Sequence, residues 1–132
     1  MTITSQPRSP ARTIARVALS GLYLVAGAAH IASPAPFIRI TPGWVPDPAL
    51  VIMLTGIAEL AGAAALLQPW LAPLRRAAGW SLAAYALCVW PANINHMLMD
   101  FGRANHGWGM MYHLPRMAAQ PLLIWAALWT GG

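Results

Sequence analysis

The chain has 132 residues, of which 58% are hydrophobic and only 8% are charged, and its formal net charge is +5. A soluble domain of this length needs a surface in which about a quarter of the residues are charged, so this composition excludes an ordinary soluble domain. The basic residues are eight arginines spread along the chain, which gives no clustered patch for nucleic acid. We therefore expect an integral membrane protein whose partner is the lipid bilayer.

Four long apolar stretches follow a polar N-terminal segment. Residues 1–12 are rich in Ser, Thr, Pro and Arg, and we expect them to form a cytoplasmic tail. Residues 13–132 then form one domain, with helices at about 13–33, 48–67, 77–99 and 112–130. A hydrocarbon core of about 30 Å is crossed by about 17–25 helical residues. The pattern thus predicts an all-α fold, a bundle of four transmembrane helices.

Prolines mark the helix boundaries. The first helix should stop before Pro34, and the Pro-rich connection at 34–48 should lie over the mouth of the bundle. Asp47 is a suitable N-cap for the second helix, and Pro48 suits the first helical position after it. Pro91 predicts a kink in the third helix.

The arginines predict the orientation in the membrane. Four crossings return both termini to one side, and the loops on the opposite side hold only Arg39 and Arg103. The side of the termini carries five arginines, namely Arg8, Arg12, Arg16, Arg75 and Arg76. We expect the protein to lie in the cell inner membrane. By the positive-inside rule, its N- and C-termini are then in the cytoplasm.

Polar residues within the apolar stretches point to a site. A charge at the centre of a membrane helix costs about 2.5–3.5 kcal/mol, so Glu59 needs an explanation. Gly56 and Gly62 share its helical face, which lets another helix approach closely, so Glu59 should face the bundle interior. Antiparallel threading brings the remaining polar residues to the outer ends of their helices. The predicted lining of an outward-facing cavity is His30, Glu59, Asn93, His96, His113, Arg116 and Gln120.

Three interpretations of this set stay open. In the first, the residues are structural: Glu59 pairs with Arg116, while Asn93 and Gln120 satisfy carbonyls freed by the helix prolines. In the second, the cavity binds a quinone or another small molecule, and the proton-handling, catalytic candidates are His30, Glu59 and His96. In the third, less favoured interpretation, His30, His96 and His113 bind a metal; no two histidines have a local ligand spacing, so such a site depends on tertiary placement.

Several segments resemble the DoxX-like family of small four-helix membrane proteins. They are AGAAH at 26–30, TGIAELAG at 55–62, WPANI at 90–94 and QPLLIW at 120–125, together with Arg116. The family is named after a membrane subunit of thiosulfate:quinone oxidoreductase. The resemblance therefore implies a link to quinone or thiol redox chemistry and a redox partner in the membrane or periplasm. Because Cys88 is the single cysteine of the chain, it cannot form an intrachain disulfide, and thiol chemistry would need that partner.

The expected function is a redox-associated membrane component that binds a quinone or other small molecule in its outer cavity. The alternative is a non-catalytic scaffold or assembly subunit, which would use its outer helix faces to stabilise a partner protein. The sequence leaves open whether the protein is an enzyme.

Overall fold

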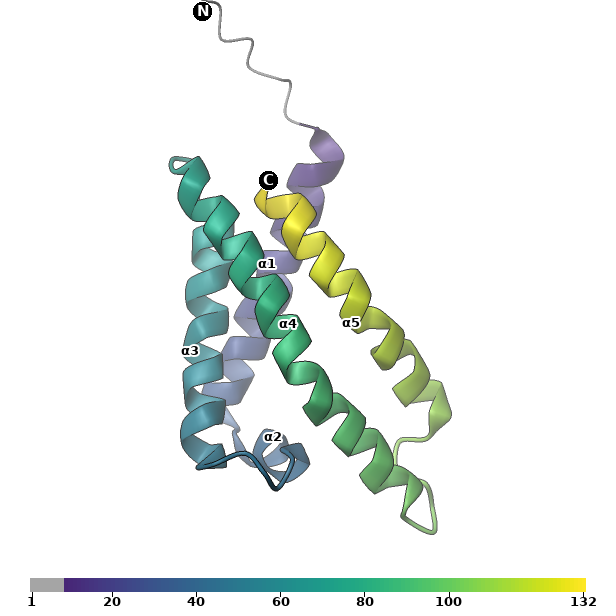
Figure 1. Ribbon diagram of the computed structural model, residues 1–132. Helices are drawn as coiled ribbons and strands as arrows, with labels where there is room; N and C mark the ends of the chain where they lie inside the picture. Colours follow the sequence, from purple (N-terminus) through teal and green to yellow (C-terminus); the bar gives the residue numbers. More distant parts are fainter. Residues whose placement is uncertain (1–8) are drawn as a thin grey trace, which may run out of the picture.

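The computed structural model describes residues 9–132, and these residues form helices and no strand (Figure 1). The helices are α1 (Pro10–Ala32), α2 (Ala35–Ile40), α3 (Pro48–Leu67), α4 (Ala72–Phe101) and α5 (Met110–Gly131). The prediction of an all-helical fold is confirmed. Most of the expected N-terminal tail, residues 1–8, lies outside the described residues, and α1 already begins at Pro10.

The four long helices are arranged as two pairs. Helix α1 packs mainly against α3 and helix α4 against α5, with further contacts between α3 and α4 and between α1 and α5. The start of α1, the turn between α3 and α4 and the C-terminus lie at one end of the bundle (Figure 1). We call this the terminal end. Helix α2 and the loop between α4 and α5 lie at the other end, which we call the loop end.

Two of the helices, α1 and α3, are long and apolar enough to cross a membrane. Helix α4 is also long, but arginines and an aspartate lie near its ends and Pro91 and Asn93 lie inside it. Helix α5 contains a histidine, an arginine, a glutamine and two prolines. By length and composition, the structure supports two of the four expected spans.

The start of α3 follows its predicted capping residue. Asp47 adopts a left-handed conformation with φ 42°, and its side chain accepts a hydrogen bond from the Leu50 amide at 3.3 Å. The predicted cap and start of α3 are confirmed. Helix α4 begins five residues earlier than expected, because Pro73 lies in its first turn, where the missing amide hydrogen is not needed.

The short helix α2 is a correction to the expected 34–48 connection. Pro36 lies in its first turn, and the Thr41 amide bonds back to the Ile38 carbonyl at 3.1 Å to close it. Prolines favour a first helical turn as well as an extended loop, and the sequence pattern does not distinguish the two.

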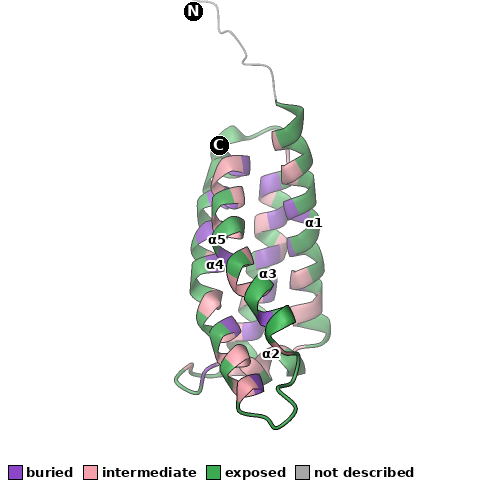
Figure 2. Cartoon of the chain, turned by 90° about the vertical axis from the view of Figure 1, so that its right-hand side faces the viewer, coloured by how far each residue is buried: buried purple, intermediate pink, exposed green. Residues whose placement is uncertain are grey.

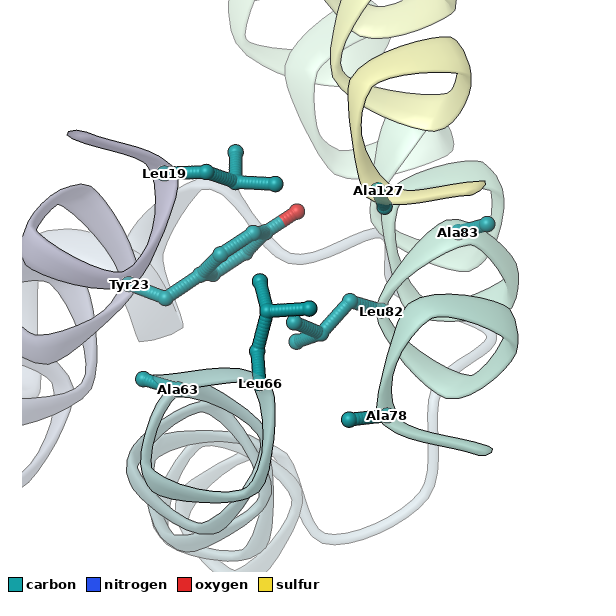
Figure 3. Packing of buried hydrophobic residues seen from close by; sticks show 8 residues of the cluster. All are labelled: Leu19, Tyr23, Ala63, Leu66, Ala78, Leu82, Ala83 and Ala127. Carbon is teal, nitrogen blue, oxygen red and sulfur yellow. The ribbon is translucent and has the colours of Figure 1, made fainter. Parts of the chain in front are cut away.

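The apolar core occupies the terminal half of the bundle. Tyr23 and Leu66 meet at its centre, and small side chains from α4 and α5 close around them (Figure 3). The buried cluster is Leu19, Tyr23, Ala63, Leu66, Ala78, Leu82, Ala83 and Ala127. Buried residues face the interior of the bundle, whereas its outer faces are largely exposed (Figure 2). Ser20 and Thr130 are also buried in this half, whereas the other buried polar residues, Glu59, Asn93, Asp100, His113 and Gln120, lie nearer the loop end.

Glycines allow close approach within each helix pair. A Cβ atom built on Gly27 of α1 would lie 2.8 Å from the carbonyl oxygen of Gly56 in α3. A Cβ atom on Gly79 of α4 would lie 2.9 Å from the Cα of Gly131 in α5. Because these neighbours are backbone atoms, a side chain at either position forces the two helices apart.

We expect Gly27→Ala to destabilise the folded protein by about 1–3 kcal/mol, since the added methyl group overpacks the contact between α1 and α3. The melting temperature in detergent should fall accordingly. The matched control is Gly21→Ala in the same helix, where an added Cβ meets nothing within 4 Å. That change should leave stability unchanged or raise it by up to about 1 kcal/mol. Equal effects of the two changes on thermal unfolding, followed by circular dichroism, would contradict this packing.

Candidate functional site

A cavity of about 580 Å³ lies between the helices in the loop half of the bundle. All five helices contribute to its lining, and most of the wall is apolar, with Leu22, Ile52, Val89 and Leu123 among its residues. Five of the seven predicted cavity residues line it, namely His30, Glu59, Asn93, Arg116 and Gln120. The predicted cavity residues His96 and His113 are not part of this lining and lie in a separate cluster.

Glu59 is paired with His30, not with Arg116. The Nδ1 atom of His30 lies 2.5 Å from Oε2 of Glu59, and both side chains are largely buried. The Phe37 ring of α2 packs edge-on against the imidazole, with 4.0 Å between ring centroids. A contact this short between an imidazole nitrogen and a carboxyl oxygen is a hydrogen bond, so a hydrogen lies between Nδ1 and Oε2. The pair joins α3 to α1 and holds a transferable proton beside the cavity.

Arg116 contacts two other side chains instead. Its guanidinium donates to Nδ1 of His96 at 2.8 Å and to the hydroxyl of Tyr112 at 3.0 Å. The predicted Glu59–Arg116 pair is therefore wrong. Because arginine only donates, Nδ1 of His96 is an acceptor and the neutral ring carries its hydrogen on Nε2.

Asp100 forms a second buried cluster that the sequence analysis missed. Its Oδ2 atom lies 2.8 Å from Nε2 of His113 and 3.4 Å from Nε2 of His96, and it accepts from the Trp108 amide at 3.0 Å. The loop is fitted closely around it, because a Cβ atom on Gly107 would lie 2.3 Å from its carboxylate. The spacing of four residues between His96 and Asp100 is the sequence signal that could have indicated the contact.

These contacts favour the charged form of Asp100, which lies just beyond the expected span at 77–99. The backbone amide of Trp108, followed by the His113 ring, lowers the pKa of Asp100 below its usual value of 3.8. The carboxylate therefore stays ionised and connects the end of α4, the loop and the start of α5.

The predicted metal set is only partly brought together. The rings of His96 and His113 are 4.9 Å apart, whereas His30 belongs to the Glu59 pair. Ligand atoms of His96, Asp100 and His113 lie within 4.8 Å of one another, and two imidazoles with a carboxylate suit zinc or iron. However, Arg103 lies 3.8 Å from the Asp100 carboxylate and Arg116 bonds to His96, so two positive charges oppose a bound cation.

The two amides have different environments. Gln120 donates to the Ala86 carbonyl at 2.7 Å, one residue before the Leu87 carbonyl that Pro91 leaves without its helical amide donor. Gln120 therefore bonds to the carbonyl next to the freed one, and the prediction that it satisfies a carbonyl freed by a helix proline is not confirmed. Asn93 is buried and lines the cavity.

Residues 19–130 match a protein family described as a domain of unknown function, DUF8561. The chain belongs to this family. The DUF8561 match includes every residue of the cavity and of the Asp100 cluster discussed above. No curated protein and no solved structure matches the chain.

A double-mutant cycle tests the buried pair. We expect Glu59→Gln alone to cost about 1–3 kcal/mol, because it leaves the buried His30 imidazole without its carboxyl partner. The effects of Glu59→Gln and His30→Gln on detergent melting should be strongly non-additive. The effects of Glu59→Gln and Arg116→Gln should instead add. Coupling in this second cycle would show that Glu59 does contact Arg116, which would contradict the arrangement described here.

The pH dependence of unfolding tests the Asp100 cluster. A carboxyl with a lowered pKa in the folded protein contributes stability above its unfolded pKa, and this contribution is lost as the pH falls through the folded value. Asp100→Asn should therefore melt below the wild type at pH 7, and the gap should narrow once the pH falls below the usual value of 3.8. The control Asp47→Asn removes the charge of an exposed carboxylate but keeps a side chain that can cap α3, and it should not reproduce the effect. A gap that does not change with pH would show that the charge of Asp100 is not what stabilises the cluster.

Proposed function

We propose that this protein is an integral membrane protein with four transmembrane helices whose cavity binds an apolar small molecule with a proton-exchanging polar group, of the quinone class. The observation that carries the proposal is the cavity of about 580 Å³ with a largely apolar wall beside the buried His30–Glu59 pair. Cavities of about 300–1,000 Å³ with few polar groups are typical of sites for small ligands.

The outer helix faces support a membrane environment. In α3 the exposed side chains Leu50, Met53, Leu54 and Ile57 repeat at helical spacing and form an apolar stripe on the outside of the bundle. Only 28% of the most apolar window of α3 is buried, which supports a lipid-facing helix over the covered core helix of a soluble protein. Helices α4 and α5 also expose large apolar side chains, namely Leu87, Ile94, Leu98, Leu114, Leu122 and Trp125.

The arrangement also supports an orientation. The terminal end carries Arg12, Arg16, Arg75 and Arg76, which lie near the start of α1 and the start of α4. With the protein in the cell inner membrane, the positive-inside rule places this end on the cytoplasmic side. The cavity then lies in the outer half of the bilayer.

The polar groups of the cavity suit a quinone. The His30–Glu59 pair can give a proton to a ligand oxygen or take one from it. The hydroxyl of Tyr23, another lining residue, is buried and has no hydrogen-bond partner in the part of the chain that the structure describes. A bound carbonyl oxygen would satisfy this donor. The resemblance to the DoxX-like family points to the same ligand class and to a redox partner that supplies or receives the electrons.

The quinone content of the purified protein tests the proposal. We expect about one quinone for each wild-type chain, extracted and measured by chromatography, and a loss of most of it in His30→Ala. The matched control, His106→Ala, changes an exposed loop histidine and should keep the quinone. His30→Ala also leaves Glu59 without its hydrogen-bond partner, so Ala119→Phe provides a second test. This change fills the cavity without removing a polar group, and it should likewise remove most of the quinone.

A folded wild type that carries no quinone and binds none on addition would contradict the proposal. In that case the exposed apolar faces of the helices would favour the alternative function, a scaffold or assembly subunit for a partner protein.

A further inference from the structure

A second cavity of about 500 Å³ lies at the loop end, beside the first. Three arginines from different elements line it: Arg39 of α2, Arg103 just after α4, and Arg116 of α5. His96 and the rings of Trp108 and Tyr112 also contribute, and no acidic residue belongs to the lining. Helix α2 and the loop between α4 and α5 meet at this end (Figure 1).

The positive charge of the second cavity is not balanced by the protein. Arg116 is partly buried, and its hydrogen-bond partners, His96 and Tyr112, are neutral. Arg39 has no carboxylate within ion-pair distance among the described residues. Arg103 is 3.8 Å from Asp100, whose carboxylate already accepts from His113 and Trp108. Of the three guanidinium groups, only that of Arg103 thus has a carboxylate within 4 Å among the described residues.

The two cavities adjoin. Phe37, Ile40 and Arg116 belong to the lining of both. The first cavity is mostly apolar, whereas the second contains the arginines, so the boundary between them is also a boundary between apolar and cationic surroundings. A ligand that lies across Arg116 would meet both environments.

We infer that the second cavity binds the anionic head group, a phosphate or a carboxylate, of an amphipathic ligand whose apolar part occupies the first cavity. The inference rests on the proposed function, since it uses the same apolar cavity. It narrows the ligand from a neutral quinone to an apolar molecule that also carries a phosphate or carboxylate group. Guanidinium groups donate paired hydrogen bonds to phosphate and carboxylate oxygens, and these charge-assisted bonds are about twice as strong as neutral ones. The head group would supply the negative charge that the cavity lacks.

Ligand titrations with matched probes test this inference. The protein is placed in phosphatidylcholine nanodiscs and titrated with dodecyl phosphate, dodecanoate, dodecanol and inorganic phosphate. Intrinsic tryptophan fluorescence reports binding, because Trp44 lines the first cavity and Trp108 the second. Empty nanodiscs correct for partitioning into lipid. The tighter of the two anionic chains identifies the head group as a phosphate or a carboxylate.

We expect at least one anionic chain to bind the wild type about tenfold or more tightly than dodecanol, which corresponds to one charge-assisted bond. Arg116→Gln should abolish this preference, and Arg39→Gln should reduce it. The matched control is Arg76→Gln, an exposed arginine at the terminal end, which should change nothing. Arg39 is also exposed, so its variant decides the result if Arg116→Gln does not fold.

Three outcomes would overturn the inference. Equal affinities for dodecyl phosphate, dodecanoate and dodecanol would show that the protein does not recognise an anionic head group, although the apolar cavity would remain a ligand site. Tight binding of inorganic phosphate alone would show a site for a free anion, unconnected to the first cavity. Failure of every dodecyl probe would also overturn the inference. If quinone is still bound, the proposed function stands; if quinone is absent as well, the proposed function is contradicted too.

Discussion

Two buried carboxylates, each held by histidine, determine how this bundle is assembled. The chain has three acidic residues, and two of them, Glu59 and Asp100, are almost fully buried. A buried carboxylate is stable only with partners that replace its water. Glu59 meets His30 across α3 and α1, and Asp100 meets His113 across α4 and α5. The close glycine contacts join the same two helix pairs, so each pair combines a small-residue contact with a carboxylate–histidine contact.

The cavity follows from this arrangement of pairs. In the terminal half, Leu66, Tyr23 and small side chains of α4 and α5 fill the space between the pairs. In the loop half no comparable cluster fills the space between the pairs, and a cavity with a largely apolar wall remains. The short helix α2 supplies Phe37, which packs on His30, and Arg39, which lines the second cavity. The predicted cover over the bundle mouth thus contributes directly to both cavities.

Composition and periodicity were sufficient to predict the helical fold and the half of the molecule that holds the polar residues. The bounds of α3 followed from Asp47 and Pro48, because capping is a local property of the chain. The partner of Glu59 did not follow, since it depends on how α1 and α3 are rotated about their contact at Gly27 and Gly56. Asp100 was expected in the loop, but the Trp108 amide folds back onto its carboxylate and α4 continues to Phe101. The contact between Asp100 and the Trp108 amide depends on how the loop folds, which residue spacing does not indicate.

The most direct test of this account is a solid-state NMR measurement of the protein in lipid bilayers. The dipolar coupling between ¹⁵N-labelled Nδ1 of His30 and the ¹³C-labelled side-chain carboxyl of Glu59 reports whether the two groups are in contact. The account predicts a strong coupling, as expected for a direct hydrogen bond between α1 and α3 beside the cavity. Absence of this coupling, with the Glu59 carboxyl coupled instead to the guanidinium of Arg116, would contradict it.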